Sequence, residues 1–155
     1  MNSSLEERLE QLQERIKIDE TNLSAELISH PHDFWHAARG TVDAISQRDK
    51  AKAILDSYSS NLNMIFRQEA AARKERVTEA QLDYMVMSDE DRIKLQEEFF
   101  KHKKHAELWQ GMKESFIQKG YALKSLVDLS RAEQSVTSSY AEQRRDAFQN
   151  YRKPD

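Results

Sequence analysis

Residues 88–95 of this chain are SDEDRIKL, and they form the clearest helix start in the sequence. Ser88 is expected to cap the helix, and the acids that follow it would meet the positive end of the helix dipole. Apolar residues then recur at helical spacing, at Ile93, Leu95, Phe99, Phe100, Ala106, Trp109, Met112, Phe116 and Ile117. We therefore predict a long amphipathic helix that either ends at Gly120 or continues through it.

The composition extends this prediction to the whole chain. The 155 residues include 3 Gly and 2 Pro, whereas an average soluble chain of this length would have roughly 19 of them. Tight turns with positive φ are therefore scarce, which argues against sandwiches, barrels and doubly wound sheets. Ala, Glu, Lys, Leu and Arg are abundant, as they are in long helices and coiled coils. The predicted fold class is all-α, with long amphipathic helices in an elongated helical bundle.

Two helices are predicted in the first part of the chain. A capping box at Ser4 precedes an apolar stripe, so a helix is expected from there to about Ile18. A second, short helix should stop before Pro31, because the residue ahead of a proline disfavours the α conformation.

A long central helix and a short one are predicted next. Asp33 is expected to cap the long helix, which would run from Phe34 to about Ala72 with a kink allowed at Gly40. A further capping box at Thr78 would start a segment through Met87, which is either a separate short helix or a resumption of the long one. These elements suggest one helical domain over residues 1–133, followed by a polar tail over 134–155 in which a weaker apolar stripe indicates a frayed or partner-dependent helix.

Charge and apolar content limit the class of protein. Hydrophobic residues make up 38% and charged residues 33% of the chain, and the formal net charge is −3. Helices this polar usually bury their stripes in long pairings or in an oligomer. The chain has no Cys, no apolar run long enough to span a membrane, and no signal-peptide pattern at its start. A cytoplasmic protein is expected.

No catalytic motif is present, so we expect neither an enzyme nor a cofactor. The sequence lacks a phosphate-binding glycine loop, a nucleophile elbow and a zinc-protease motif. His32 and His36 are four residues apart, but two histidines without further ligands are far more typical of capping or solvent-facing side chains. No metal site is predicted.

Two cationic clusters are the candidate binding residues. The first contains Arg67, Arg73, Lys74 and Arg76 beside Phe66, and the second contains Lys101, Lys103 and Lys104. Cations next to an aromatic ring can neutralise phosphates and stack bases, which is the minimal requirement for binding single-stranded DNA. The alternative for the first cluster is a charged helix end or loop. The alternative for the second is a solvated helix face, which the surrounding glutamates favour.

Apolar side chains provide the candidates for packing between helices or subunits, namely Leu5, Leu9, Leu12, Trp109 and Phe116. Trp35 and the Phe99–Phe100 pair also lie on apolar stripes. For these aromatics, core or subunit packing is expected rather than base stacking.

Several motifs, taken in order, resemble a known family. They are IDETNLSAE at 18–26, Phe34–Trp35 after Pro31, MSDEDRIKL at 87–95, Phe99–Phe100 and QKGYALK at 118–124. Together they resemble the UvsY-type recombination mediators of T-even-like phages, over the region from Leu5 to Glu133. That family's central helix usually ends in a basic, Tyr-rich segment, whereas the equivalent residues 61–67 here are NLNMIFR. Basic residues reappear at 73, 74 and 76, so the DNA surface is expected to be displaced along the chain.

The resemblance implies a non-enzymatic, ring-like homo-oligomer in the cytoplasm of an infected bacterial host cell. Such mediators bind single-stranded DNA, contact the phage's RecA-like recombinase and its single-strand-binding protein, and help the recombinase replace the latter. The alternative hypothesis is a coiled-coil structural protein or protein-interaction adaptor that does not bind DNA, which the acidic net charge favours.

Overall fold

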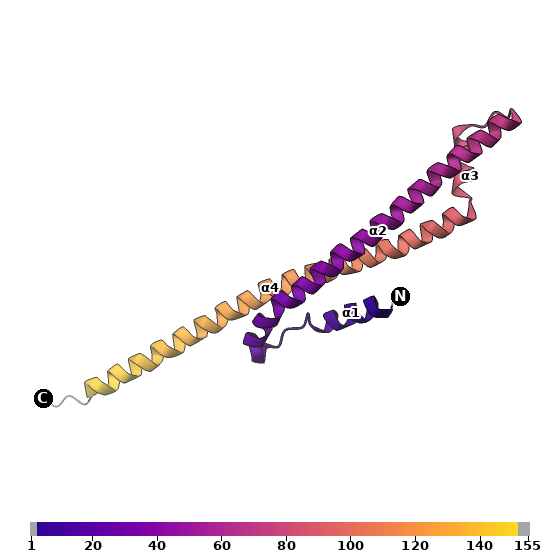
Figure 1. Ribbon diagram of the computed structural model, residues 1–155. Helices are drawn as coiled ribbons and strands as arrows, with labels where there is room; N and C mark the ends of the chain where they lie inside the picture. The colour runs from indigo at the N-terminus through magenta and orange to yellow at the C-terminus, as the bar shows by residue number, and fades with distance from the viewer. Residues whose placement is uncertain (1–2, 152–155) are drawn as a thin grey trace. The chain divides into compact units, whose positions relative to one another are not determined.

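The computed structural model describes the backbone of residues 3–151 and the side chains of residues 7–145. It contains α1 (Ser3–Glu14), a 3₁₀ turn (Glu20–Asn22), α2 (Leu23–Arg73), α3 (Glu79–Met87) and α4 (Glu90–Tyr151), as shown in Figure 1. No strand occurs in this part of the chain. The prediction of an all-α protein is confirmed.

The helices form two compact units. One unit contains Met1–Phe34 and Glu114–Asp155, and the other contains Trp35–Lys113. The second unit is one continuous stretch of sequence, the first combines both ends of the chain, and α2 and α4 each contribute residues to both units. The predicted boundary at residue 133 does not coincide with a helix end, because α4 continues through it to Tyr151.

In the unit of residues 35–113, α2 packs along α4, and α3 connects the two (Figure 1). The centre of this contact is the Trp109 indole, which is completely buried and lies directly against Gly40. Next to it, the single hydrogen of the Thr41 hydroxyl is shared between the Trp109 carbonyl (3.0 Å) and the Ala37 carbonyl (2.8 Å). Glycine at position 40 therefore permits a close approach of the two helices rather than a kink.

In the other unit, a buried lysine connects α4 to the first part of the chain. The Lys119 ammonium, 2% exposed, lies 2.6 Å from the Glu26 carboxylate. It also donates to the Arg15 carbonyl (2.6 Å) and the Lys17 carbonyl (3.1 Å). These two carbonyls follow the end of α1 at Glu14, so the predicted end near Ile18 is wrong. The chain leaves the helix early because its carbonyls bond to the ammonium.

Pro31 does not end a helix, and the prediction of two helices around it is wrong. It lies inside α2, and Asp33 is an interior residue of the same helix rather than a cap. The Asp33 carboxylate is 1% exposed and lies 2.9 Å from Arg15 Nη1. Packing and this ion pair fix the segment as helix, although Pro31 removes one backbone hydrogen bond from it.

The start of α4 differs by one residue from the prediction. Asp89, not Ser88, provides the cap, because its carboxylate accepts a hydrogen bond from the Arg92 N–H at 2.8 Å. Ser88 instead closes α3, where its N–H donates to the Tyr84 carbonyl at 2.9 Å. The capping box at Thr78 is confirmed by both of its hydrogen bonds.

α4 continues through Gly120 without interruption, so the second of the two predicted alternatives is confirmed. Within the described residues, no helix is both long and apolar enough to cross a lipid bilayer.

Candidate functional site

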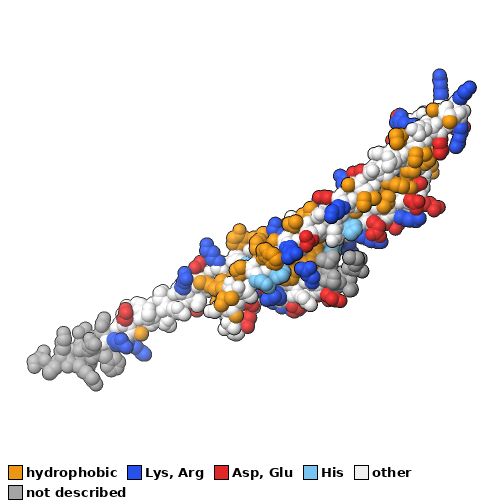
Figure 2. Space-filling view, viewed as in Figure 1, with side chains coloured by type: hydrophobic (Ala, Val, Ile, Leu, Met, Phe, Trp, Pro, Cys, Tyr) orange, Lys and Arg blue, Asp and Glu red, His pale blue; other side chains and the backbone are white. Residues whose placement is uncertain are grey.

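The first cationic cluster lies where α2 ends, and we call Arg67, Arg73, Lys74 and Arg76 the cationic turn. Lys74 has φ of 57°, the left-handed conformation that follows many helix ends. Its N–H donates to the Ala71 carbonyl (3.1 Å), and the Glu75 N–H donates to the Ala70 carbonyl (3.0 Å). This pair of bonds is a Schellman motif, so the backbone of the turn is fixed. Figure 2 shows cationic side chains projecting from the unit where α2 meets α3.

Two of these four cations are paired within the chain. Arg67 bonds to the Asn63 side chain (2.7 Å) and to the Glu79 carboxylate, and Arg73 lies 3.4 Å from Glu69. All the paired side chains are at least half exposed. Exposed pairs of this kind contribute little stability, so a phosphate can compete for the arginines.

Lys74 and Arg76 form no ion pair with any other residue in the described part of the chain. Both side chains are exposed. The turn therefore presents two cations without an ion pair and two whose ion pairs are weak.

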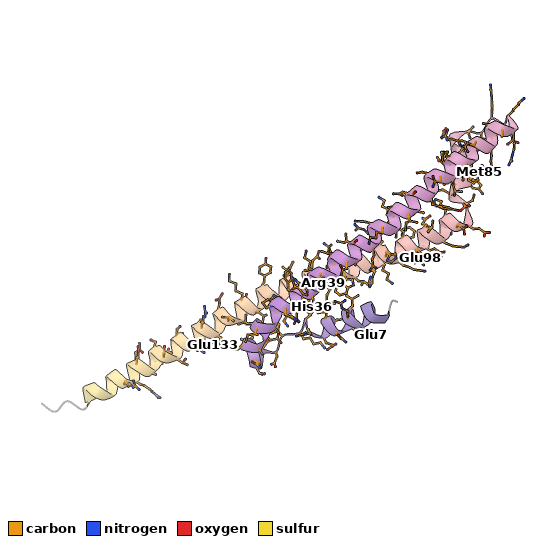
Figure 3. All side chains as sticks on the ribbon, viewed as in Figure 1. Glu7, His36, Arg39, Met85, Glu98 and Glu133 are labelled. Atoms are coloured by element: carbon orange, nitrogen blue, oxygen red, sulfur yellow. The ribbon has the colours of Figure 1, made fainter. Side chains whose placement is uncertain are left out.

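Sequence reasoning missed the aromatic ring beside this turn, which is Tyr84. Its side chain is 75% exposed and lines a shallow depression together with Arg76, Val77 and Met85, the last of which is labelled in Figure 3. The signal was present in the sequence: Leu82 and Val86 are four residues apart and buried, which places Tyr84 on the opposite face of α3. The aromatic noted from the sequence, Phe66, is half-buried.

The second cluster is a separate feature on α4. Lys101 lies 2.6 Å from Glu98 and Lys103 lies 4.0 Å from Glu107. The hydrogen bond to Glu98, with the charge of the same residue, raises the pKa of Lys101. Lys101 lies about 17 Å along the helix from the start of α4 at Glu90. Lys104 forms no ion pair within the described residues, and the exposed pairs of Lys101 and Lys103 are as weak as those of Arg67 and Arg73. Both interpretations of this cluster, a phosphate-binding patch and a solvated face, therefore stay predictions.

The aromatic residues predicted to pack differ in burial. Trp109 is fully buried, but Trp35 and Phe100 are each 52% exposed, and Phe99 is half-buried. The Trp35 ring carries the Arg39 guanidinium on its face, 5.4 Å from the ring centre. Trp35 is therefore not a core residue of this chain.

The remaining packing candidates lie mainly in the interior. Phe116 is fully buried beside His30, with ring centres 6.3 Å apart, and Leu12 is 8% exposed. Leu9 is half-buried, and the side chain of Leu5 is outside the described residues. Leu12, Trp109 and Phe116 thus pack between helices of one chain, which leaves their role in subunit contacts a prediction.

Histidines and acids do not gather into a metal centre. Among the residues that the structure describes, no group of three or more His, Cys, Asp or Glu could hold an ion. His32 is directed to a carboxylate instead, with Nδ1 3.7 Å from Asp33.

Comparisons with known proteins identify no relative of this chain. No family model, no curated protein and no solved structure matches the chain.

Proposed function

We propose that this protein binds single-stranded DNA through the cationic turn and acts as a recombination mediator. In this role it would promote the loading of a RecA-like phage recombinase in place of the single-strand-binding protein. The observation that supports the proposal is the placement of exposed Tyr84 beside Arg76 of the cationic turn, in a depression that Glu75 also lines. Arginine and lysine neutralise phosphates of any sequence, and an exposed ring stacks any base.

A single copy of this turn would bind weakly, because the chain as a whole has a net charge of −3. Each neutralised phosphate adds only about 0.7 to the slope of log affinity against log salt. A ring-like homo-oligomer would repeat the turn, so that after one contact the others form at high local concentration. Assembly is therefore part of the proposed mechanism, since it would hold a strand extended for transfer to the recombinase.

One observation favours the alternative, a coiled-coil adaptor that binds only protein. Every described side chain from 131 to 145 is exposed along α4, and Val136 and Tyr140 are 55% and 67% exposed. A helix with unpaired apolar residues is a suitable partner for another helix. This function would require no cationic turn.

Charge reversal tests the proposal, with binding of labelled oligo-dT measured by fluorescence anisotropy at low salt. The triple variant Arg73→Glu, Lys74→Glu, Arg76→Glu should bind more weakly, and its salt slope should fall by about 2. The matched control reverses the charges of Lys101, Lys103 and Lys104 on α4. It changes the net charge of the chain by the same amount as the first triple variant. Light scattering should show the same assembly for both variants.

Each failure has a distinct meaning. If the wild-type protein does not bind oligo-dT at any salt concentration, the adaptor replaces the mediator. If the two triple variants lose affinity equally, DNA responds to total charge and the cationic turn is not the site.

A further inference from the structure

We infer that Trp35 and Arg39 on α2 form a second stacking site, which takes one base and its phosphate from single-stranded DNA. The inference rests on the proposed function, since it assigns a further contact to the same ligand. It starts from the contrast between the two tryptophans of the chain: Trp109 is 0% exposed and Trp35 is 52% exposed.

Two side chains of α2 border the exposed indole. The Arg39 guanidinium lies over the ring at 5.4 Å from its centre, and the His36 ring meets it edge-on, with centres 5.0 Å apart. Figure 3 labels His36 and Arg39 on this part of α2. Because about half of the Trp35 surface is exposed beside these two side chains, a planar base can stack on the open part of the ring.

The charge around this indole is complementary to a nucleotide. No ion pair neutralises Arg39 among the described residues, although Asp43 follows it by one helical turn. The nearest acid before the indole, Asp33, is 1% exposed and lies against Arg15. A phosphate that enters with the base therefore meets the Arg39 guanidinium, with the exposed carboxylate of Asp43 one helical turn further along α2.

A nucleobase fits this surface better than an apolar protein partner does. Val42, two helical turns after Trp35, is 66% exposed, but Arg39 lies between them on the helix. Ile28, two helical turns before Trp35, is also exposed, but three apolar side chains spaced seven residues apart provide less of a desolvated centre than protein interfaces need. A single base needs only the ring face and a cation.

The stacking site is independent of the cationic turn. Arg39 and Arg73 both belong to α2, and 34 residues of helix separate them by about 51 Å. Effects of substitutions at such a distance usually add. The two contacts can therefore be tested separately in one protein.

Intrinsic fluorescence gives a direct test, since Trp35 is the accessible one of the two tryptophans. Oligo-dT should quench the emission of the wild-type protein, and Trp35→Phe should remove the quenching while affinity stays within about twofold, because the ring is kept. Trp35→Ala should lower the affinity roughly fivefold or more. Arg39→Gln should reduce the salt slope by about 0.7. The matched control, Val42→Ala, removes neighbouring apolar surface and should change none of these values.

Three results would overturn the assignment. Binding of oligo-dT by anisotropy without quenching of Trp35 would remove the stacking site and leave the mediator proposal intact. Dissociation of the assembly by Trp35→Ala or Val42→Ala, with unchanged DNA affinity, would make this face a protein interface. If wild-type protein binds no oligo-dT by either method, the proposed function itself fails.

Discussion

Alanine substitution at the three glycines should give opposite effects on stability. Gly40 and Gly111 both lie inside long helices, where glycine costs about 1 kcal/mol relative to alanine. A Cβ at position 111 would meet nothing within 4 Å. A Cβ at position 40 would lie 2.5 Å from Trp109 Cη2 and closer still to Cζ3 and Cε3, whereas real contacts of this kind stay above 3.0 Å.

The magnitudes follow from these surroundings. Gly111→Ala should stabilise the protein by up to about 1 kcal/mol. Overpacking costs about 1–3 kcal/mol, and the indole of Trp109 is fully buried and cannot move into solvent, so the upper half of that range applies. After subtraction of the gain in helix propensity, Gly40→Ala should destabilise by about 1–2 kcal/mol. Gly120→Ala should fall between them, because its Cβ would be 2.8 Å from the end of a single side chain, His30 Nε2.

Thermal unfolding followed by far-ultraviolet circular dichroism measures the series, at about 2–4 °C per kcal/mol for a chain of this size. Gly40→Ala should lower Tm, and Gly111→Ala should raise it. Trp109→Phe tests whether the contact with the indole causes the loss. The double variant with Gly40→Ala should lose less free energy of unfolding than the two single variants lose together. The reasoning is refuted if Gly40→Ala melts at or above the wild-type temperature, or if the single losses simply add.

Three other substitutions test the turn and the buried charges. Lys74→Gly should stabilise the protein by about 0.5–1 kcal/mol in urea unfolding, because Lys74 has positive φ; a loss would contradict the Schellman geometry. Lys119→Met should cost about 3–5 kcal/mol in the same assay, since it leaves Glu26 without its cation, whereas the exposed Lys124→Met should cost little. Burial, with the charge of Lys119, holds the pKa of His30 below its ordinary 6.5, so the stability that depends on neutral His30 is fully present above pH 6.5 and is lost as pH falls below it. His30→Gln should flatten this decline, and an unchanged pH profile would assign it to other groups.

Periodicity predicted the helices well because their apolar residues repeat with the helical period. The stripe that contains Trp109 and Phe116 indicated the buried face of α4, and both residues are fully buried. Local capping chemistry was also informative, as at Thr78, since its hydrogen bonds connect residues three apart in sequence.

Long-range polar contacts could not be predicted in the same way. Pro31 and Asp33 carry local signals for a helix end and a helix start, and both signals were overruled by tertiary structure. The carboxylate of Asp33 is buried against Arg15, and the ammonium of Lys119 is buried against carbonyls more than 100 residues away in sequence. Nothing in the spacing of charged residues distinguishes such a buried pair from a solvated one.

The candidate site shows the same division between local and long-range information. Its cations were apparent because they are close in sequence. Which of them form ion pairs with carboxylates could not be inferred from their positions in the sequence. The exposure of Tyr84 depends on which face of α3 packs, and that of Trp35 depends on where α4 lies along α2. An aromatic on an apolar stripe is usually buried, so exposed rings beside Arg76 and Arg39 are the residues that structure adds to the prediction. Both rings lie next to a cation, and that pairing is the reason to test them with single-stranded DNA before a protein partner.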